Sequence, residues 1–358
     1  MEDHKKLLLV GTSPHILTED NTRSIMLDVL IAMAPALAAG TYFFGFRVLV
    51  MTVFSAAACV AFEFLWQLLM KKRSSIGDLS AIVTGVLLVF VLPASVPYWM
   101  VLVGDFFAIV VVKQLFGGLG KNFMNPALAG RVFLSGWATL LNTYPLPSTD
   151  PGYVKLPVFG NIPMTNGIPD AVTGATPLAA MKEGLLPGQS FLELFLGMKG
   201  GCVGEVSAAL LLLGGVYLLV RKVITFRIPV GFLGAFALLS LLFPPAGTNG
   251  FQWMLTSLLT GGVILGAVFM ATDYSTSPVT PGAQWVFAAG CGLLTFVIRR
   301  FGAYNEGVAY SILIMNSTVW LLDKYIRPRR FGSGKKVKKE AEAVMAEIKR
   351  KNQGGEAQ

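Results

Sequence analysis

The sequence predicts an all-α polytopic membrane protein, with about ten transmembrane helices in two inverted five-helix repeats and a long external loop between them. Three observations support this fold class. Hydrophobic residues make up 54% of the 358 residues and charged residues only 14%, a composition too apolar for a soluble domain. Apolar runs of spanning length recur along the chain. Similar glycine-rich stretches also occur once in each half.

The apolar runs are bounded by charged residues, glycine or proline. The third run, of about fourteen residues, is too short to cross a hydrocarbon core of about 30 Å as a helix that rises 1.5 Å per residue. It must continue as broken backbone lined by protein, a feature of transporter-like sites. The ten candidate spans are 24–44, 48–70, 79–92, 98–112, 126–141, 203–220, 228–243, 252–271, 284–298 and 308–322.

Basic residues predict the orientation, because they concentrate in cytoplasmic loops. Eleven of the 29 Lys and Arg residues lie from Lys324 onward, and we expect both termini on the cytoplasmic side of the inner membrane. Within 335–351, apolar residues form one stripe of an amphipathic helix suited to lipid or a partner subunit. The predicted regions are a cytoplasmic segment 1–23, a first membrane repeat 24–141, an external loop 142–201, a second membrane repeat 202–324 and a basic tail 325–358.

An internal repeat supports the two-half organisation. Residues 84–88 and 115–122 are echoed by residues 261–265 and 300–307, each followed by an apolar helix. Five spans per half is an odd number, so the halves enter the membrane from opposite faces. Chance similarity between glycine-rich loops is the alternative.

Composition also excludes several classes of site. The cysteines Cys59, Cys202 and Cys291 are far apart and only two histidines are present, so neither an iron–sulfur nor a zinc site is predicted. The basic tail explains much of the net charge of +9, and we expect no nucleic-acid binding. The first twenty or so residues lack the long apolar region of a secretory leader.

Residues 170–177, Asp-Ala-Val-Thr-Gly-Ala-Thr-Pro, form a small polar segment in an otherwise apolar chain. Gly174 and Ala175 leave the backbone open beside Thr176, and Pro177 stops a helix from continuing back through it. We therefore expect the Thr176 hydroxyl on an exposed turn, accessible to a modifying enzyme. An ordinary Ser/Thr-Gly turn is the alternative.

This segment resembles the flavin-attachment motif of the family that joins subunits of Rnf complexes and of Na⁺-translocating NADH:quinone reductases. The resemblance implies covalent FMN on Thr176 through a phosphoester bond, with Asp170, Thr173, Gly174 and Ala175 completing the motif. It also implies a flavin transferase, which uses the threonine hydroxyl to attack the pyrophosphate of FAD. A further family signature, Ser-Pro-His, matches residues 13–15.

The loop 117–126, Gly-Gly-Leu-Gly-Lys-Asn-Phe-Met-Asn-Pro, places a cation and two amides at the entry to a helix. This loop lacks the residue order Gly-x-x-x-x-Gly-Lys-Ser/Thr of a phosphate-binding P-loop, so nucleotide hydrolysis is not predicted. By resemblance to the quinone reductase, Asn122 and Asn125, next to Lys121, are candidates for binding a non-covalent riboflavin. Capping of the following helix is the alternative.

Carboxylates beside apolar segments are candidates for a Na⁺ or H⁺ path. Asp273, in the signature-like run 270–281, and Asp105 are the two we single out. The alternative for Asp273 is a hydroxyl-rich turn capped by its carboxylate, and Asp28, Glu63 and Asp105 can equally be polar ties between helices.

Basic residues are expected mainly in cytoplasmic loops, but Arg299 and Arg300 lie on the predicted outer side with Thr176. A bidentate arginine suits the phosphate of a flavin held there. Interfacial snorkelling of both side chains is the alternative.

The resemblance runs through the whole chain and implies a membrane subunit of a redox-driven ion-translocating oxidoreductase, closer to the Rnf D-type subunits than to the quinone-reductase B-type. Flavins rather than side chains carry the redox chemistry, so no catalytic side chain is expected. The implied partners are the Rnf A, B, C, E and G subunits, the flavin transferase and membrane lipid. A urea-type solute channel is the alternative of another class, since inverted five-helix repeats also build such channels.

Overall fold

The chain is described here from a computed structural model, which covers residues 21–72, 75–137, 176–302 and 304–327 and a few isolated positions. The described part is mostly helical, as the sequence predicts. It also contains one antiparallel pair of two-residue strands, β1 (Met164–Thr165) and β2 (Ile168–Pro169). The isolated positions are 141, 144–145, 157–158, 164–165, 168–169 and 345.

Each of the ten apolar runs contains helix, but the helices differ in length. Only α1 (Thr22–Phe44), α2 (Arg47–Leu69) and α13 (Pro281–Phe301) are, within the described residues, long and apolar enough to cross a membrane alone. A fourth candidate span is broken, because α11 (Gly250–Leu259) and the stretch Val263–Met270 are bent by 66°. The other helices in these runs are α3 (Ser80–Phe90), α4 (Tyr98–Phe106), α5 (Pro126–Leu134), α9 (Ala208–Val220), α10 (Arg227–Leu242) and α14 (Val308–Tyr325).

Several boundaries differ from those expected. The fourth run continues from α4 into a π-helix, η2 (Phe107–Gln114), and the fifth ends in a 3₁₀ turn, η3 (Ser135–Trp137). The sixth starts at Ala208 because Ser207 caps α9, with a separate 3₁₀ turn, η4 (Val203–Glu205), before it. The remaining short elements are η1 (Ile76–Asp78), α7 (Pro177–Lys182), α8 (Phe191–Leu196), α12 (Val263–Leu265) and the π-helix η5 (Gly266–Met270).

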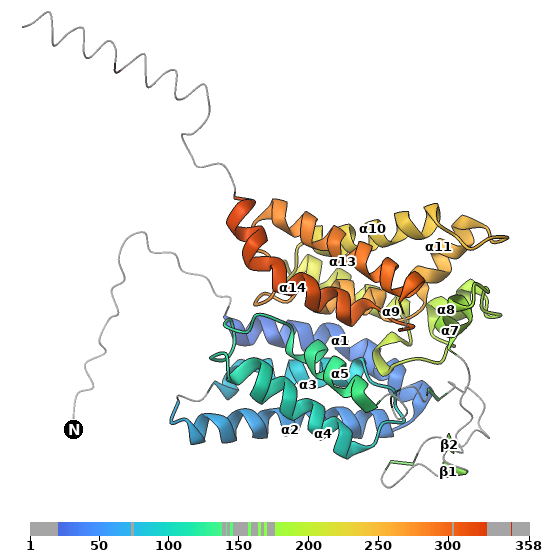
Figure 1. Ribbon diagram of the computed structural model, residues 1–358. Coiled ribbons are helices and arrows are strands. Elements are labelled where there is room, and N and C mark those ends of the chain that lie inside the picture. The colour runs from blue at the N-terminus through green and yellow to red at the C-terminus, as the bar shows by residue number, and fades with distance from the viewer. Residues whose placement is uncertain are drawn as a thin grey trace, which may run out of the picture.

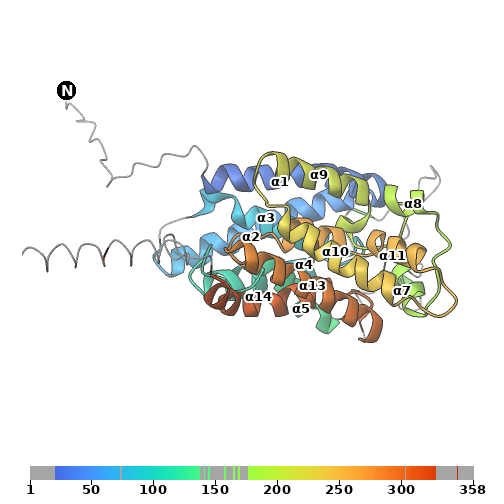
Figure 2. The same cartoon turned by 90° about the horizontal axis from the view of Figure 1, so that it is seen from above.

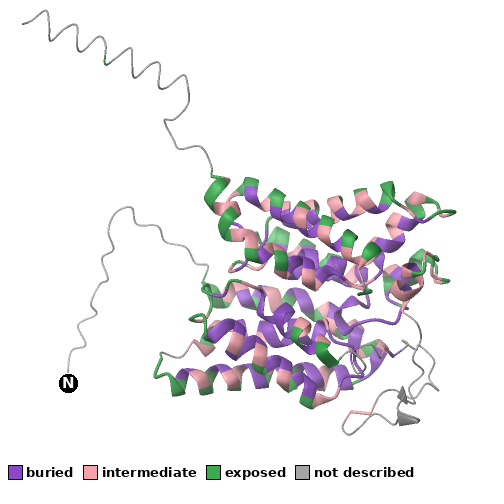
Figure 3. Cartoon of the chain, in the orientation of Figure 1, coloured by how far each residue is buried: buried purple, intermediate pink, exposed green. Residues whose placement is uncertain are grey.

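The helices gather in two halves (Figure 1). Helices α1–α5 form one half and α9–α14 the other, with α1 packed against α9 and α5 against α14. Buried residues face the interior between the helices, whereas many outward positions are exposed apolar residues (Figure 3). Such an outer surface is what lipid contact requires.

The two ends of the bundle are distinct. Helices α7 and α8 lie at one end, called here the Thr176 end, and the described N-terminal and C-terminal residues lie at the opposite end, called the Asn122 end (Figures 1 and 2). Close packing holds the halves together between these ends. A Cβ added to Gly214 of α9 would lie 2.2 Å from the carbonyl oxygen of Ala32 in α1, so only glycine allows this approach.

Polar ties between helices are present at all three predicted carboxylates. Asp28 of α1 accepts a hydrogen bond from Tyr217 at 2.8 Å and pairs with Arg221 of α9 at 3.1 Å, which connects the halves. Glu63 and Lys113 form an ion pair at 2.7 Å, with side chains 1% and 2% exposed. Asp105 is tied to α2, as described below.

Arg47 anchors residue Pro157 of the long loop to the first half. Its buried guanidinium donates to the carbonyls of Ala94, Val96 and Pro157 at 2.8–3.0 Å. The hydroxyl of Tyr98, whose ring lies 4.9 Å from the guanidinium, donates to the Val158 carbonyl. The α3–α4 connection and residues 157–158 are therefore held as one unit.

Three predicted features lie outside the described residues: the signature at 13–15, the motif residues Asp170, Thr173, Gly174 and Ala175, and the tail helix within 335–351 apart from the helical, exposed Met345.

Candidate functional site

Thr176 lies on the wall of a cavity at the Thr176 end. Its extended backbone places it as the N-cap of α7, where its Oγ1 accepts a hydrogen bond from Ala179 N at 3.3 Å, and Pro177 follows at the first helical position. Half-burial leaves the side chain at the cavity wall rather than on a fully exposed turn. As an acceptor in this cap, Oγ1 keeps its own proton available for other chemistry.

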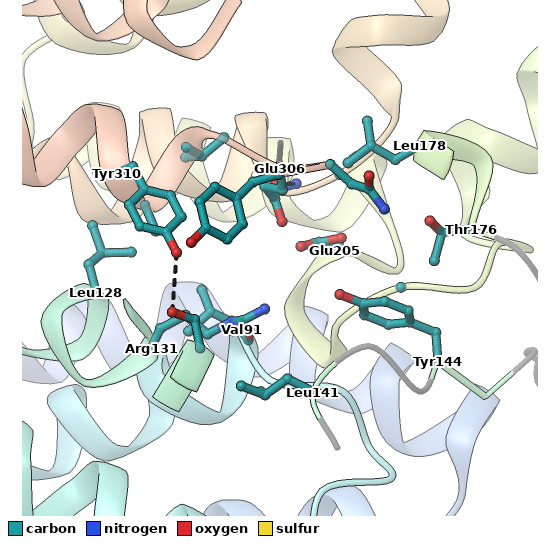
Figure 4. A pocket seen from close by; sticks show the side chains of 18 of the residues that line it. Val91, Leu128, Arg131, Leu141, Tyr144, Thr176, Leu178, Glu205, Glu306 and Tyr310 are labelled. Carbon is teal, nitrogen blue, oxygen red and sulfur yellow. Dashed lines mark hydrogen bonds between the residues drawn. The ribbon is translucent and has the colours of Figure 1, made fainter. Parts of the chain in front are cut away.

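This cavity, called the Thr176 cavity, encloses about 1210 Å³ of empty space including its open mouth. Segments far apart in the sequence meet around it (Figure 4). Its walls include Val91, Leu128, Arg131, Leu141, Tyr144, Thr176, Leu178, Lys199, Glu205, Gly262, Tyr304, Glu306 and Tyr310.

Two cations line this cavity, and neither was singled out from the sequence. Arg131 of α5 is partly fixed by its Nε, which donates to the Val91 carbonyl at 2.9 Å. Lys199 is 3% exposed and donates from Nζ to the Leu259 carbonyl. Burial lowers the pKa of Lys199 below its ordinary value, although the neighbouring Glu205 acts in the opposite direction.

The predicted phosphate ligands Arg299 and Arg300 are placed elsewhere. Arg299 donates to the carbonyls of Ser257 and Thr260 at 3.0 and 3.2 Å and lies 3.5 Å from a Glu306 oxygen. Arg300 is exposed and lines a separate, smaller hollow beside α7. Within the described residues, neither arginine lines the cavity that holds Thr176.

Arg299 instead stabilises the break between α11 and α12. The carbonyls that α11 leaves unpaired at its C-terminal end accept from Arg299 and Lys199, and the Gly262 N–H at the start of α12 donates to Glu306 Oε1. Cations at a helix C-terminus and an anion at a helix N-terminus match the helix dipoles. Gly261, with φ of +68°, makes the turn between them.

Aromatic rings cover other walls of the Thr176 cavity. Tyr304 and Tyr310 stack with centroids 4.7 Å apart, and the Tyr310 hydroxyl lies 3.2 Å from Ser135 Oγ (Figure 4). Tyr144 faces the cavity from the opposite wall (Figure 4), and burial raises its pKa. Flat rings beside two cations and a hydroxyl suit a ligand with an aromatic system and a phosphate.

A second cavity lies at the Asn122 end, with about 730 Å³ of empty space including its mouth. Asn122 is 4% exposed and donates to the Met124 carbonyl and to Ser275 Oγ, both at 3.1 Å, but its Oδ1 has no partner among the described residues. A buried acceptor without a donor is costly and suits a ligand that supplies one. Other walls come from Ser80, Thr84, Lys113, Asn125, Pro126 and Asp273.

Asn125 has a different role from Asn122. Its Oδ1 accepts from Ala127 N at 3.0 Å and Leu128 N at 3.3 Å, and its Nδ2 donates to the Met270 carbonyl at 3.2 Å. Both ends of the amide are therefore used in capping α5 and joining the halves. Lys121 is exposed and is not among the residues that line the cavity, whereas the buried Lys113 is.

The two ion-path candidates lie in different settings. Asp273 lines the second cavity and accepts from Ser275 Oγ and Thr276 Oγ1 at 2.8 and 2.9 Å; burial raises its pKa, and these hydrogen bonds oppose that rise. Asp105 is fully buried, accepts from Ser55 Oγ at 2.7 Å and Cys59 Sγ at 3.3 Å, and has no partner on Oδ2 within the described residues. The structure therefore does not bring these two carboxylates into one described cavity.

Apolar helices of spanning length, a broken span and an apolar outer surface are those of an integral membrane protein. Residues 9–332 match the NQR2, RnfD, RnfE family, and the chain belongs to that family.

Similar proteins are named as D subunits of ion-translocating oxidoreductase complexes. The chain is 45% identical over 339 residues to the D-type subunit of the Na(+)-translocating ferredoxin:NAD(+) oxidoreductase complex of Acetobacterium woodii, covering 94% of this chain and 98% of that one. It is 38% identical over 340 residues to the D-type subunit of the proton-translocating ferredoxin:NAD(+) oxidoreductase complex of Clostridium ljungdahlii, covering 92% and 97%. It is also 38% identical over 330 residues to the D-type subunit of the ion-translocating oxidoreductase complex of Stutzerimonas stutzeri, covering 86% and 91%.

Proposed function

We propose that this chain is the D-type membrane subunit of an Rnf-type redox-driven ion-translocating complex, and that it carries electrons through FMN bound covalently to Thr176. The observation that carries the proposal is the position of Thr176 on the wall of a cavity with two cations and three tyrosines. The names of the similar subunits support the assignment of the complex. The quinone-reductase B-type subunit is the related alternative within the same family.

The residues around the Thr176 cavity fit such a group. Arg131 and Lys199 supply positive charge for a phosphate, and Tyr144, Tyr304 and Tyr310 supply flat surfaces for a ring system. Attachment joins Thr176 Oγ1 to the FMN phosphate of FAD, with AMP as the leaving group and loss of the hydroxyl proton. The bound flavin would supply one- and two-electron chemistry, and the protein positions it and excludes water.

A second flavin is proposed in the cavity at the Asn122 end. The unpartnered Oδ1 of Asn122 is a ready acceptor for an N–H or O–H of the ligand. Asn125 supports this cavity by capping α5, rather than by binding the ligand. One flavin at each end would allow electron transfer across the membrane, with the Thr176 end facing outward and both termini in the cytoplasm.

The architecture proposed for this role is a pair of inverted five-helix repeats. Helices α1 and α9, equivalent in such a repeat, run antiparallel, because Asp28 near the start of α1 contacts Tyr217 and Arg221 near the end of α9. The other equivalent pair in contact is α5 and α14. Contacts between equivalent helices of opposite direction are expected about a pseudo-two-fold axis in the membrane plane.

The test compares three variants for covalent flavin, detected as in-gel fluorescence of the denatured protein from cells that contain the transferase. Thr176→Ala removes the hydroxyl and the N-cap, whereas Thr176→Asn removes the hydroxyl but keeps a good N-cap. Both should be dark. Thr248→Ala, at another half-buried threonine at the Thr176 end, should stay fluorescent. A dark parent protein or a fluorescent Thr176→Asn protein would refute the assignment and favour a solute channel.

A further inference from the structure

Two carboxyl groups near Thr176 have no role in the proposed attachment: Glu205 is buried, and the Glu306 side chain is 29% exposed. Glu205 of η4 and Glu306 between α13 and α14 both line the Thr176 cavity, and Glu205 projects between Glu306 and Tyr144 in Figure 4. One oxygen of each carboxyl group and the Cys202 sulfur lie within 4.8 Å of one another. Two carboxylates this close repel each other, so ionising both costs more than ionising one.

The two carboxyl groups have unequal surroundings. Glu306 accepts from the Gly262 N–H and lies 3.5 Å from Arg299, so its negative charge is stabilised where α12 begins. Glu205 is 7% exposed and forms no ion pair with a described Lys or Arg. The charge of Lys199 also acts on Glu205, but from beyond ion-pair distance, whereas burial and the Glu306 carboxyl group within 4.8 Å both favour a proton on Glu205. Glu205 is therefore the member of the pair that holds one.

The cationic side chains near Glu205 donate hydrogen bonds to backbone carbonyls. Lys199 donates to the Leu259 carbonyl, Arg299 to the Ser257 and Thr260 carbonyls, and the Nε of Arg131 to Val91. These contacts place part of the cationic charge on helix ends rather than on Glu205. The titratable and charged groups around the carboxyl pair are Lys199, Cys202, Arg299, Arg131, Tyr144, Tyr304 and Tyr310.

We infer that Glu205 is the proton-carrying residue of the Thr176 cavity, exchanging one proton with the cavity as the charge of the group bound at Thr176 changes. The inference rests on the proposed flavin for its redox partner, but the proton on Glu205 follows from the protein alone. In this role the Glu205 carboxyl would release its proton to water at the mouth of the cavity when the cavity loses an electron, and its O–H bond would form again, with a proton taken from water, when an electron enters. The electron comes from the partner redox subunits of the complex.

The first experiment needs no flavin. The infrared carbonyl stretch of protonated carboxyl groups is followed from neutral to alkaline pH in Thr176→Asn protein. The same measurement is made with Glu205→Gln added, and with Glu183→Gln added as the control, because Glu183 is an exposed carboxylate at the end of α7. The Glu205→Gln protein should lose one band that the Glu183→Gln protein retains. An unchanged spectrum in Glu205→Gln would overturn the inference.

The second experiment uses the intact complex. The midpoint potential of the Thr176 flavin is measured against pH in the parent, Glu205→Gln and Glu183→Gln proteins. The pH dependence should become shallower only in Glu205→Gln. If the infrared band is lost but the pH dependence is unchanged, Glu205 holds a proton without exchanging it, and the inference fails. Absence of flavin from Thr176 in the parent would refute the proposed function, while the infrared result would still decide whether Glu205 carries a proton.

Discussion

The Lys113–Glu63 ion pair allows a quantitative test of how the first half is held together. Both side chains are almost fully buried, and the 2.7 Å contact joins η2 to α2. Lys113 Nζ also donates to Ser80 Oγ at 2.6 Å, and Glu63 accepts from Ser75 Oγ at 2.7 Å. Substitution Lys113→Met removes one charge, two hydrogen bonds and little volume, and it leaves the Glu63 carboxylate buried without a counter-ion.

The expected cost of Lys113→Met is about 3–5 kcal/mol in the free energy of unfolding, the range found when one partner of a buried pair is removed. Adding Glu63→Gln to Lys113→Met removes the stranded charge, so the double variant should be more stable than Lys113→Met alone by about 2 kcal/mol or more. Arg221→Met is the control, because the Arg221 side chain of the Arg221–Asp28 pair is 54% exposed. Its loss should cost about 1 kcal/mol or less.

The protein carries its own reporter for this measurement. Cys59, Cys202 and Cys291 are free and buried, so a thiol-reactive fluorogenic dye reacts only as the fold opens. The midpoint of dye reaction on heating in detergent should fall clearly for Lys113→Met, partly recover in the double variant and hardly change for Arg221→Met. If Lys113→Met and Arg221→Met shift the midpoint equally, or if Glu63→Gln lowers it further, the pair does not stabilise the protein in the way described.

Three further outcomes are expected. Asn122→Ala should lower the affinity for extractable flavin about tenfold with little loss of stability. Asn125→Ala should instead cost about 1–2 kcal/mol in the free energy of unfolding, because α5 loses its cap. Equal effects of the two variants on flavin affinity would refute this division of roles. Burial lowers the pKa of Lys199 from 10.5 to about 8, so between these pH values the unfolded chain holds a proton on Lys199 that the folded chain lacks. The contribution of Lys199 to stability should therefore increase with pH, and the thermal midpoint of the parent relative to Lys199→Met should rise between about pH 8 and 10.5; a constant difference would contradict this. A membrane-impermeant thiol reagent applied to intact cells should label Asn166→Cys but reach Gly334→Cys only after permeabilisation; the reverse pattern would invert the proposed orientation.

Local features could be predicted because they depend on nearby residues. The cap of α5 by Asn125, the alternative given for that residue, follows from a residue type that often precedes a helix, whereas α13 starts at Pro281, three residues before the predicted span 284–298. The break after α11 was not predicted, since residues 252–271 have the composition of one continuous span. Mean hydropathy is averaged over many residues, so it does not detect a backbone turn made by a single residue such as Gly261.

The composition of the Thr176 cavity could be predicted only in part. Arg131 interrupts an apolar run, and a charge within a candidate span is a signal of function that would have indicated it. The pairing of Glu205 with Glu306 had no comparable signal, because the two residues are far apart in the sequence, with several helices between them, and meet only through the fold. For the same reason, Arg299 does not line the Thr176 cavity: the direction of its side chain depends on the break in α11–α12.

The anchoring of the long loop limits how electrons can travel. Residues 157 and 158 are fixed on the first half by Arg47 and Tyr98, and α7 is fixed on the second half, where Lys182 Nζ donates to the Gly302 carbonyl at 2.9 Å. Thr176 caps the N-terminus of α7, so a flavin attached to its hydroxyl would be held in a fixed position rather than on a mobile segment. A donor or acceptor must then bring its own redox centre to the mouth of this cavity, and docking geometry at that rim would govern the rate of each electron transfer.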